Sequence, residues 1–176
     1  MNRGRRVAVL AELAEQMRTR GSWCGETHLQ KATYILEELM EVPLDYEFIL
    51  YKHGPFSFDL RDELTAMRAD GLLALLPQPF PYGPSLVATP ASQELRQRYP
   101  KTLKTYAKEI VFVADRLSSK GVNSLEKLAT AIYVGLEEHP DDPVERLTQL
   151  KPHVSKLEAR AAVEEANSVI SESGHA

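Results

Sequence analysis

YEFILYKHGPFSFDLRDELTAMRADGLL, residues 46–73, is the stretch from which the fold of this chain is predicted. In its first six residues, YEFILY, the side chains of Tyr46, Phe48 and Leu50 alternate with those of Glu47, Ile49 and Tyr51. This period of two is the pattern of a strand. The following HGP sequence is expected to end that strand, because Pro55 has no N–H for a ladder and Gly54 tolerates positive φ. A tight turn is therefore predicted directly before Phe56.

A capped helix is predicted after this turn. Ser57 is a good N-cap, and Asp59 lies in the first turn, where the helix dipole favours a carboxylate. Gly71 suits the left-handed backbone position that follows the last helical turn. The apolar side chains expected on the buried face of the helix are Leu60, Leu64 and Met67.

A β-hairpin is predicted beyond Gly71. Leu72–Leu76 forms an apolar strand, Pro77–Pro84 is too rich in proline to pair, and Leu86–Ala88 is the returning strand. A helix followed by such a hairpin is the element order of a winged helix, in which the hairpin is the wing. Winged helices bind DNA and proteins alike, so this order predicts a fold and leaves the function open.

Cap and breaker residues divide the rest of the chain into helices. An amphipathic helix that ends near Arg20 precedes a second one, for which Thr27 and Gln30 form a predicted capping box. After the hairpin, one long helix is predicted from Leu103 to Leu117, and the next is expected to begin at Ser124. Further helix starts are predicted at Thr89-Pro90, at Asp142-Pro143 and at a capping box of Ser155 with Glu158.

The predicted fold is therefore mainly α with a small β-hairpin wing. Residues 1–90 form a winged-helix-like N-terminal half, residues 91–170 form a helical half packed on it as one structural domain, and residues 171–176 form a frayed tail. A chain of 176 residues suits one domain, and its apolar fraction of 43% is ordinary for a globular protein. No apolar run suits a membrane span or a signal peptide, which predicts a cytoplasmic protein without membrane contact.

Few residue patterns indicate catalysis or a metal site. The single cysteine, Cys24, excludes an internal disulfide and a multi-cysteine metal centre. The histidines have neither HxxxH nor HExxH spacing, and the chain has no GxSxG motif and no phosphate-binding glycine loop. We therefore predict a protein that is not an enzyme and that needs no cofactor and no metal.

The net charge of −4 is unlike that of a nonspecific nucleic-acid binder, but the charge is unevenly spread. Residues 32–71 carry 3 Lys and Arg against 9 Asp and Glu, whereas residues 72–124 carry 7 against 3. Any basic surface must therefore come from the N-terminal arm and the segment after the wing. The densest basic run is Arg96, Arg98, Lys101, Lys104 and Lys108.

The helix that would read DNA in a winged helix is itself divided in charge. At 100° per residue, its two arginines lie on one flank, whereas three of its four carboxylates lie on the opposite flank and the fourth, Asp62, lies on the outer face. Carboxylates repel phosphate, so a solvated helix face is the simpler interpretation. The arginine flank consists of Arg61, Thr65 and Arg68, and the carboxylate side consists of Asp59, Asp62, Glu63 and Asp70.

Candidate contact residues for a partner or for DNA lie in the turn, the helix and the wing. Lys52 and His53 are candidates for contact with phosphate or an acidic partner, with ordinary turn residues as the alternative interpretation. An aromatic patch around the turn and wing, Phe56, Phe58, Phe80, Pro81 and Tyr82, would favour a protein partner if it is exposed. The complete set of candidates is Lys52, His53, Phe56, Phe58, Arg61, Asp62, Arg68 and Tyr82.

The chain resembles a known family in four segments. LQKATYIL at 29–36 and YKHGPFS at 51–57 resemble the LQK…Y…YKHGPYS…L pattern of YwgA-like proteins. LEKLATAIY at 125–133 and Lys151-Pro152 also resemble segments of that family. The same pairing is similar to the C-terminal domain of DarG-type antitoxins and, more distantly, to SocA-like (Panacea) antitoxin domains.

This resemblance implies a noncatalytic winged-helix-like module that holds a toxin or another protein partner, with a DNA-binding transcriptional regulator as the alternative. In DarG-type proteins the related domain accompanies a macrodomain that removes ADP-ribose, and these residues contain no macrodomain. Partner binding predicts an exposed apolar patch near Phe56 and Phe58 with carboxylates such as Asp62 at its rim. DNA binding predicts a dimer, and a shared surface for the N-terminal arginines, the basic run, Arg61 and Arg68.

Overall fold

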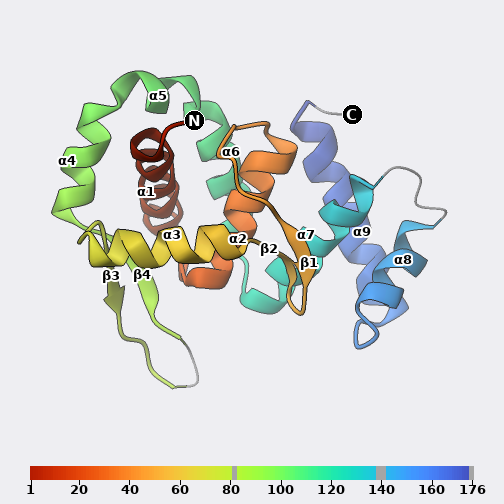
Figure 1. The fold of residues 1–176 in the computed structure, drawn as a ribbon. Coiled ribbons are helices and arrows are strands. Elements are labelled where there is room, and N and C mark those ends of the chain that lie inside the picture. Colours follow the sequence, from red (N-terminus) through yellow and green to blue (C-terminus); the bar gives the residue numbers. More distant parts are fainter. Residues whose placement is uncertain (81–82, 138–141, 175–176) are drawn as a thin grey trace.

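The computed structural model describes residues 1–80, 83–137 and 142–174. It is mainly helical, as the sequence predicts, and it contains two small antiparallel strand pairs where the sequence predicts one hairpin (Figure 1). Helix α1 (Arg3–Thr19) packs against α2 (Glu26–Tyr34), α4 (Pro90–Arg98), α5 (Pro100–Thr105) and α6 (Ala107–Leu117). Its residues 7–11 are all buried, so α1 is a central helix and not the one-sided amphipathic helix of the sequence interpretation.

Helix α2 differs from its prediction at both ends. The capping box of Thr27 with Gln30 is wrong, because the helix begins at Glu26 with Gly25 as N-cap and no capping side chain. Gln30 is therefore too far along the helix to reach back to its first turn, and its amide is buried elsewhere. At its C-terminal end α2 continues directly into a π-helical turn, η1 (Ile35–Leu39).

The first hairpin contains a strand where the sequence pattern predicts a break. Strand β1 (Ile49–Tyr51) is shorter than the expected six residues and ends before the HGP sequence as predicted. It pairs antiparallel with β2 (Gly54–Phe56), however, so the expectation that Pro55 takes no part in a ladder is wrong. Pro55 pairs with Leu50 one position beyond the turn. Alternate pairs of an antiparallel ladder carry no hydrogen bond, and a proline in such a pair sacrifices none.

The second hairpin follows α3 (Phe58–Ala69) as predicted. Ser57 accepts a hydrogen bond from the Leu60 amide, and Gly71 has φ +70°. The Leu72 amide bonds the Met67 carbonyl, which completes a Schellman-type helix end. Strands β3 (Leu73–Leu76) and β4 (Ser85–Ala88) then pair antiparallel.

The helices after this hairpin follow their predicted caps with two corrections. Tyr106 interrupts the predicted helix 103–117 with φ −105° and ψ 18°, so α5 and α6 are separate helices. The helix expected at Ser124 begins at Val122 with Gly121 as its N-cap. Thr89 and the Ser155–Glu158 capping box act as predicted. The remaining helices are α7 (Val122–Gly135), α8 (Pro143–Leu150), which Asp142 caps, and α9 (Lys156–Glu172).

Helices α7, α8 and α9 pack together on the opposite side of α2 from α1 (Figure 1). Helix α9 extends to Glu172, which is two residues into the predicted frayed tail, and residues 175–176 lie outside the described chain. Among the described helices, none has the length and apolar character needed to cross a membrane.

Glu37 in η1 leads to a prediction about pH. The Glu37 carboxylate accepts a hydrogen bond from the Tyr46 amide at 3.0 Å, and burial raises the pKa of Glu37 from 4.5 to about 7. Between pH 4.5 and 7 the folded state therefore keeps a proton that the unfolded state releases, so the free energy of unfolding falls as pH rises. We expect this group to contribute a fall of about 1–2 kcal/mol after partial solvent screening.

The measurement is the urea midpoint at pH 4.5 and pH 7.5 in three proteins. Glu37→Gln removes the titrating group and keeps an acceptor for Tyr46, so its decline in stability is expected to be smaller than that of the unmodified chain. Glu38→Gln alters the exposed neighbouring carboxylate and is the control. Equal declines in all three proteins would contradict the prediction.

Candidate functional site

The sequence segments 29–36, 51–57, 125–133 and 151–152 meet at the β1–β2 hairpin. From α2, the buried Lys31 ammonium donates a hydrogen bond to the Pro55 carbonyl at 2.8 Å. The neighbouring Gln30 amide donates to the Ser57 carbonyl at 2.9 Å and accepts from the Ser57 amide at 3.0 Å. These contacts tie the first two segments together and hold the start of α3.

The other two segments contact the turn of the same hairpin. Lys151 donates to the Lys52 carbonyl at 2.6 Å, and His53 Nδ1 lies 3.1 Å from a Glu126 carboxylate oxygen on α7. The His53 ring is otherwise exposed. Lys52 thus contributes a backbone carbonyl to this junction while its side chain is exposed, and His53 contributes its ring to the contact with Glu126.

Burial of Lys31 lowers its pKa to about 8, with a smaller opposing contribution from Glu126. A buried ammonium that donates to a carbonyl and faces a nearby carboxylate has a structural role here. Lys31 thus anchors the hairpin to α2, and its charge is not presented to a partner.

An exposed apolar surface covers the outer side of the hairpin. Ile49 pairs with Phe56 across the two strands, and Tyr51 lies on the same face as Ile49. The Tyr51 ring centroid lies 5.9 Å from that of Phe56 and 5.8 Å from that of Phe58. Ile49, Tyr51 and Phe58 are 43%, 48% and 42% exposed. We call Ile49, Tyr51, Phe56 and Phe58 the aromatic face.

Charged side chains border the aromatic face. The Arg61 guanidinium lies 5.2 Å from the Phe58 ring centroid and pairs with Asp62 at 3.0 Å. Both charged groups are exposed on α3. The structure thus brings Phe56, Phe58, Arg61 and Asp62 together as predicted.

The predicted patch does not extend to the second hairpin as one surface. Phe80 is 98% exposed, but it lies in the β3–β4 connection, and the two hairpins adjoin opposite ends of α3 (Figure 1). Pro81 and the candidate Tyr82 lie outside the described residues. The aromatic ring that packs beside Phe56 and Phe58 is Tyr51, and not a residue of the predicted wing. The period-two pattern of the strand is the sequence signal that puts Ile49 and Tyr51 on one face of the hairpin.

The carboxylate flank of α3 is occupied by the N-terminal arginines. Arg3 pairs with Glu63 and with Asp70 at 2.9 Å, and Arg6 lies 3.5 Å from Glu63. Glu63 is only 8% exposed. DNA binding is expected to place the N-terminal arginines on the same surface as Arg68. This expectation is wrong for Arg3 and Arg6, because they lie on the carboxylate flank of α3, opposite Arg68. Asp62, unlike Glu63, is exposed on the surface of α3.

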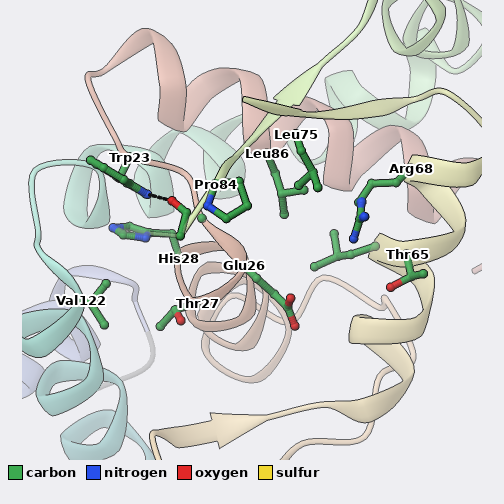
Figure 2. Close-up of a pocket in the computed structure, with 13 residues that line it drawn as sticks. Trp23, Glu26, Thr27, His28, Thr65, Arg68, Leu75, Pro84, Leu86 and Val122 are labelled. Carbon is green, nitrogen blue, oxygen red and sulfur yellow. Dashed lines mark hydrogen bonds between the residues drawn. The ribbon is translucent and has the colours of Figure 1, made fainter. Parts of the chain in front are cut away.

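A pocket of about 340 Å³ lies on the arginine flank of α3. Figure 2 shows Thr65 and Arg68 of α3 on one side of it and Trp23 and His28 on the other. The Trp23 indole donates to the Gly83 carbonyl at 3.2 Å, which joins the start of α2 to the second hairpin. The sequence pattern places Thr65 and Arg68 on one flank of α3, but it does not predict the facing wall with Trp23 and His28, which comes from a separate part of the chain.

Cys24 lies in the core beside this region and is not a nucleophile. Its thiol is fully buried, and burial raises its pKa to about 12. A thiolate is therefore not present near neutral pH. Within the described ranges, no three His, Cys, Asp or Glu side chains are grouped to hold a metal ion.

Comparison of the chain with models of known protein families and with curated proteins gave no match. The aromatic face and the pocket beside Arg68 both have residue types that are common in binding sites. The first combines exposed aromatic rings with a charged rim, and the second combines an apolar wall with an arginine.

Proposed function

We propose that this chain is a noncatalytic winged-helix-like module of antitoxin type, which binds a protein partner such as a toxin through the aromatic face. The observation that carries this proposal is the exposure of Ile49, Tyr51 and Phe58 on one surface. Aromatic side chains are enriched in the buried centres of protein interfaces, and polar residues form their rims. Arg61 and Asp62 occupy the position of such a rim.

The way the hairpin is held also supports a binding role. Lys31, Gln30 and Lys151 bind backbone atoms of the hairpin and of the adjoining Ser57 from its inner side. The aromatic rings are therefore presented on a supported backbone, which reduces the entropy lost when a partner binds. The order of α3 and the β3–β4 hairpin is consistent with the winged-helix part of the proposal.

The proposal predicts that the double substitution Tyr51→Ser and Phe58→Ser abolishes capture of the partner. Each buried aromatic anchor typically contributes about 1–2 kcal/mol or more, so the affinity is expected to fall by roughly 100-fold in total. The experiment captures proteins from a nuclease-treated extract of the cells that encode the chain and identifies them by mass spectrometry. Both side chains are exposed, so the thermal unfolding midpoint should change little.

The matched control is Leu157→Ser on α9, which removes an apolar side chain that is 79% exposed on a different surface. A partner retained by the control and lost from the double variant supports the aromatic face. Equal retention by both variants shows that binding occurs elsewhere. Asp62→Lys, which leaves the buried Glu63 pairs intact, tests whether the carboxylate at the rim contributes.

A DNA-binding regulator is the second candidate, because the basic run is exposed from Arg98 onward. Arg96 pairs with Glu12 at 2.7 Å, and no ion pair within the described chain involves Arg98, Lys101, Lys104 or Lys108. DNA binding would make the affinity fall steeply with salt. Recovery of nucleic acid alone, with no protein lost from the double variant, favours this candidate.

A further inference from the structure

The pocket on the arginine flank of α3 has the composition of a small-ligand site. We propose that it binds a small organic carboxylate with an apolar body. Its volume of about 340 Å³ falls in the usual range for such sites, roughly 300–1,000 Å³. The apolar part of its wall consists of Trp23, Leu64, Leu75, Pro84, Leu86 and Val122.

The apolar wall is only partly covered by the chain itself. Leu75 in β3 is 44% exposed and Val122 at the start of α7 is 42% exposed, and both line the pocket. These side chains come from opposite sides of the pocket in Figure 2. An apolar body between them would remove both from water, which is the favourable contribution to binding.

Arg68 supplies the charge that selects a carboxylate. Its side chain extends from α3 toward the pocket in Figure 2, and it has no hydrogen bond or ion pair within the described chain. This distinguishes it from Arg61 on the same flank, which pairs with Asp62. A planar guanidinium binds a carboxylate through two parallel hydrogen bonds.

The N-terminal turn of α2 forms part of the facing wall. Gly25 caps this helix without a side chain, and the residues that follow it, Glu26, Thr27 and His28, line the pocket. Their amides have no acceptor within the described part of the chain. Helix N-termini favour anions, so this wall and Arg68 select the same ligand charge.

Glu26 is the group in the pocket that opposes this selection. Its carboxylate is exposed and lies in the first helical turn, where the helix dipole and water stabilise it. A ligand governed by Glu26 would be a cation. The sign of the preferred ligand charge is therefore the direct test of the proposal.

Trp23 makes that test possible, because it is the single tryptophan of the chain and lines the pocket. Three probes that share a phenyl ring and an alkyl chain, 4-phenylbutyrate, 4-phenylbutanamide and 4-phenylbutylamine, are titrated while Trp23 fluorescence is recorded. We expect saturation by the carboxylate with a Kd of about 1 mM, as suits a ligand of this size. The amide is expected to bind about 10-fold more weakly, and the amine more weakly still.

Variants then locate the charge. Arg68→Gln is expected to weaken 4-phenylbutyrate about 10-fold and to leave the amide unchanged, whereas Arg61→Gln on the same flank leaves both unchanged. Both arginines are exposed, so neither variant is expected to disturb folding. The proposal is overturned if no probe changes Trp23 fluorescence saturably, if the amine binds best, or if the two variants behave alike. The aromatic-face variants do not enter this test, so its failure is separable from that of the proposed function.

Discussion

Gly54→Ala is expected to lower the free energy of unfolding by about 2–4 kcal/mol, the combined effect of backbone strain and overpacking. Gly54 has φ +87°, and a Cβ atom there would lie 2.7 Å from Thr130 Oγ1. That hydroxyl donates to the Glu126 carbonyl at 2.7 Å, so it cannot rotate away without losing its hydrogen bond. The hairpin would have to move away from α7, where it is now anchored.

Gly71→Ala is the matched control for this prediction. Gly71 also has positive φ, at +70°, but among the described residues a Cβ atom added there would meet no heavy atom within 4 Å apart from its own residue and the two adjacent ones. It should therefore show the backbone penalty alone, about 1 kcal/mol. Urea unfolding of both variants measures the difference. If the two variants are equally destabilised, close packing of the hairpin on α7 does not contribute to stability.

Gln30→Ala is expected to lower the free energy of unfolding by a similar amount, about 2–4 kcal/mol. The buried Gln30 amide bonds both the N–H and the carbonyl of Ser57. The substitution leaves the buried Ser57 N–H without this acceptor, while its carbonyl keeps only the Arg61 amide. It also leaves a cavity, so desolvation and lost packing act in the same direction.

The same substitution at Gln93, an exposed position of α4, is the control and should change stability by less than about 0.5 kcal/mol. Chemical denaturation of the two variants at one pH measures the contrast. A Gln30→Ala variant as stable as Gln93→Ala would mean that water replaces the lost amide. Because Gln30 supports Ser57 beside Phe58, its loss is also expected to weaken partner capture through the aromatic face.

Features that depend on a few neighbouring residues were predictable from the sequence. Ser57 caps α3, Gly71 ends it, and the Ser155–Glu158 box begins α9, each as expected. These helix starts and ends depend on side-chain and backbone preferences within one helical turn. The predicted capping box of Thr27 with Gln30 has the right spacing but is wrong. The Gln30 side chain instead makes two tertiary hydrogen bonds to the Ser57 backbone.

The candidate site was predictable only in part for the same reason. Phe56, Phe58, Arg61 and Asp62 are close in sequence, and they do lie together. Arg68, on the same predicted flank as Arg61, instead faces a pocket built from distant segments. Its neighbours across that pocket belong to α2, α7 and the second hairpin, whose relative positions no local pattern encodes.

By itself, the sequence determined the helical class, the second hairpin, most helix caps and the division of α3 into two charged flanks. Tertiary structure alone decided which of these groups remain available for binding. Arg3 neutralises the buried Glu63 on one flank, while Arg68 on the other has no ion pair within the described residues. The physical reason is that charge pairing and burial depend on atoms within a few ångströms, and folding brings those atoms together from far along the chain.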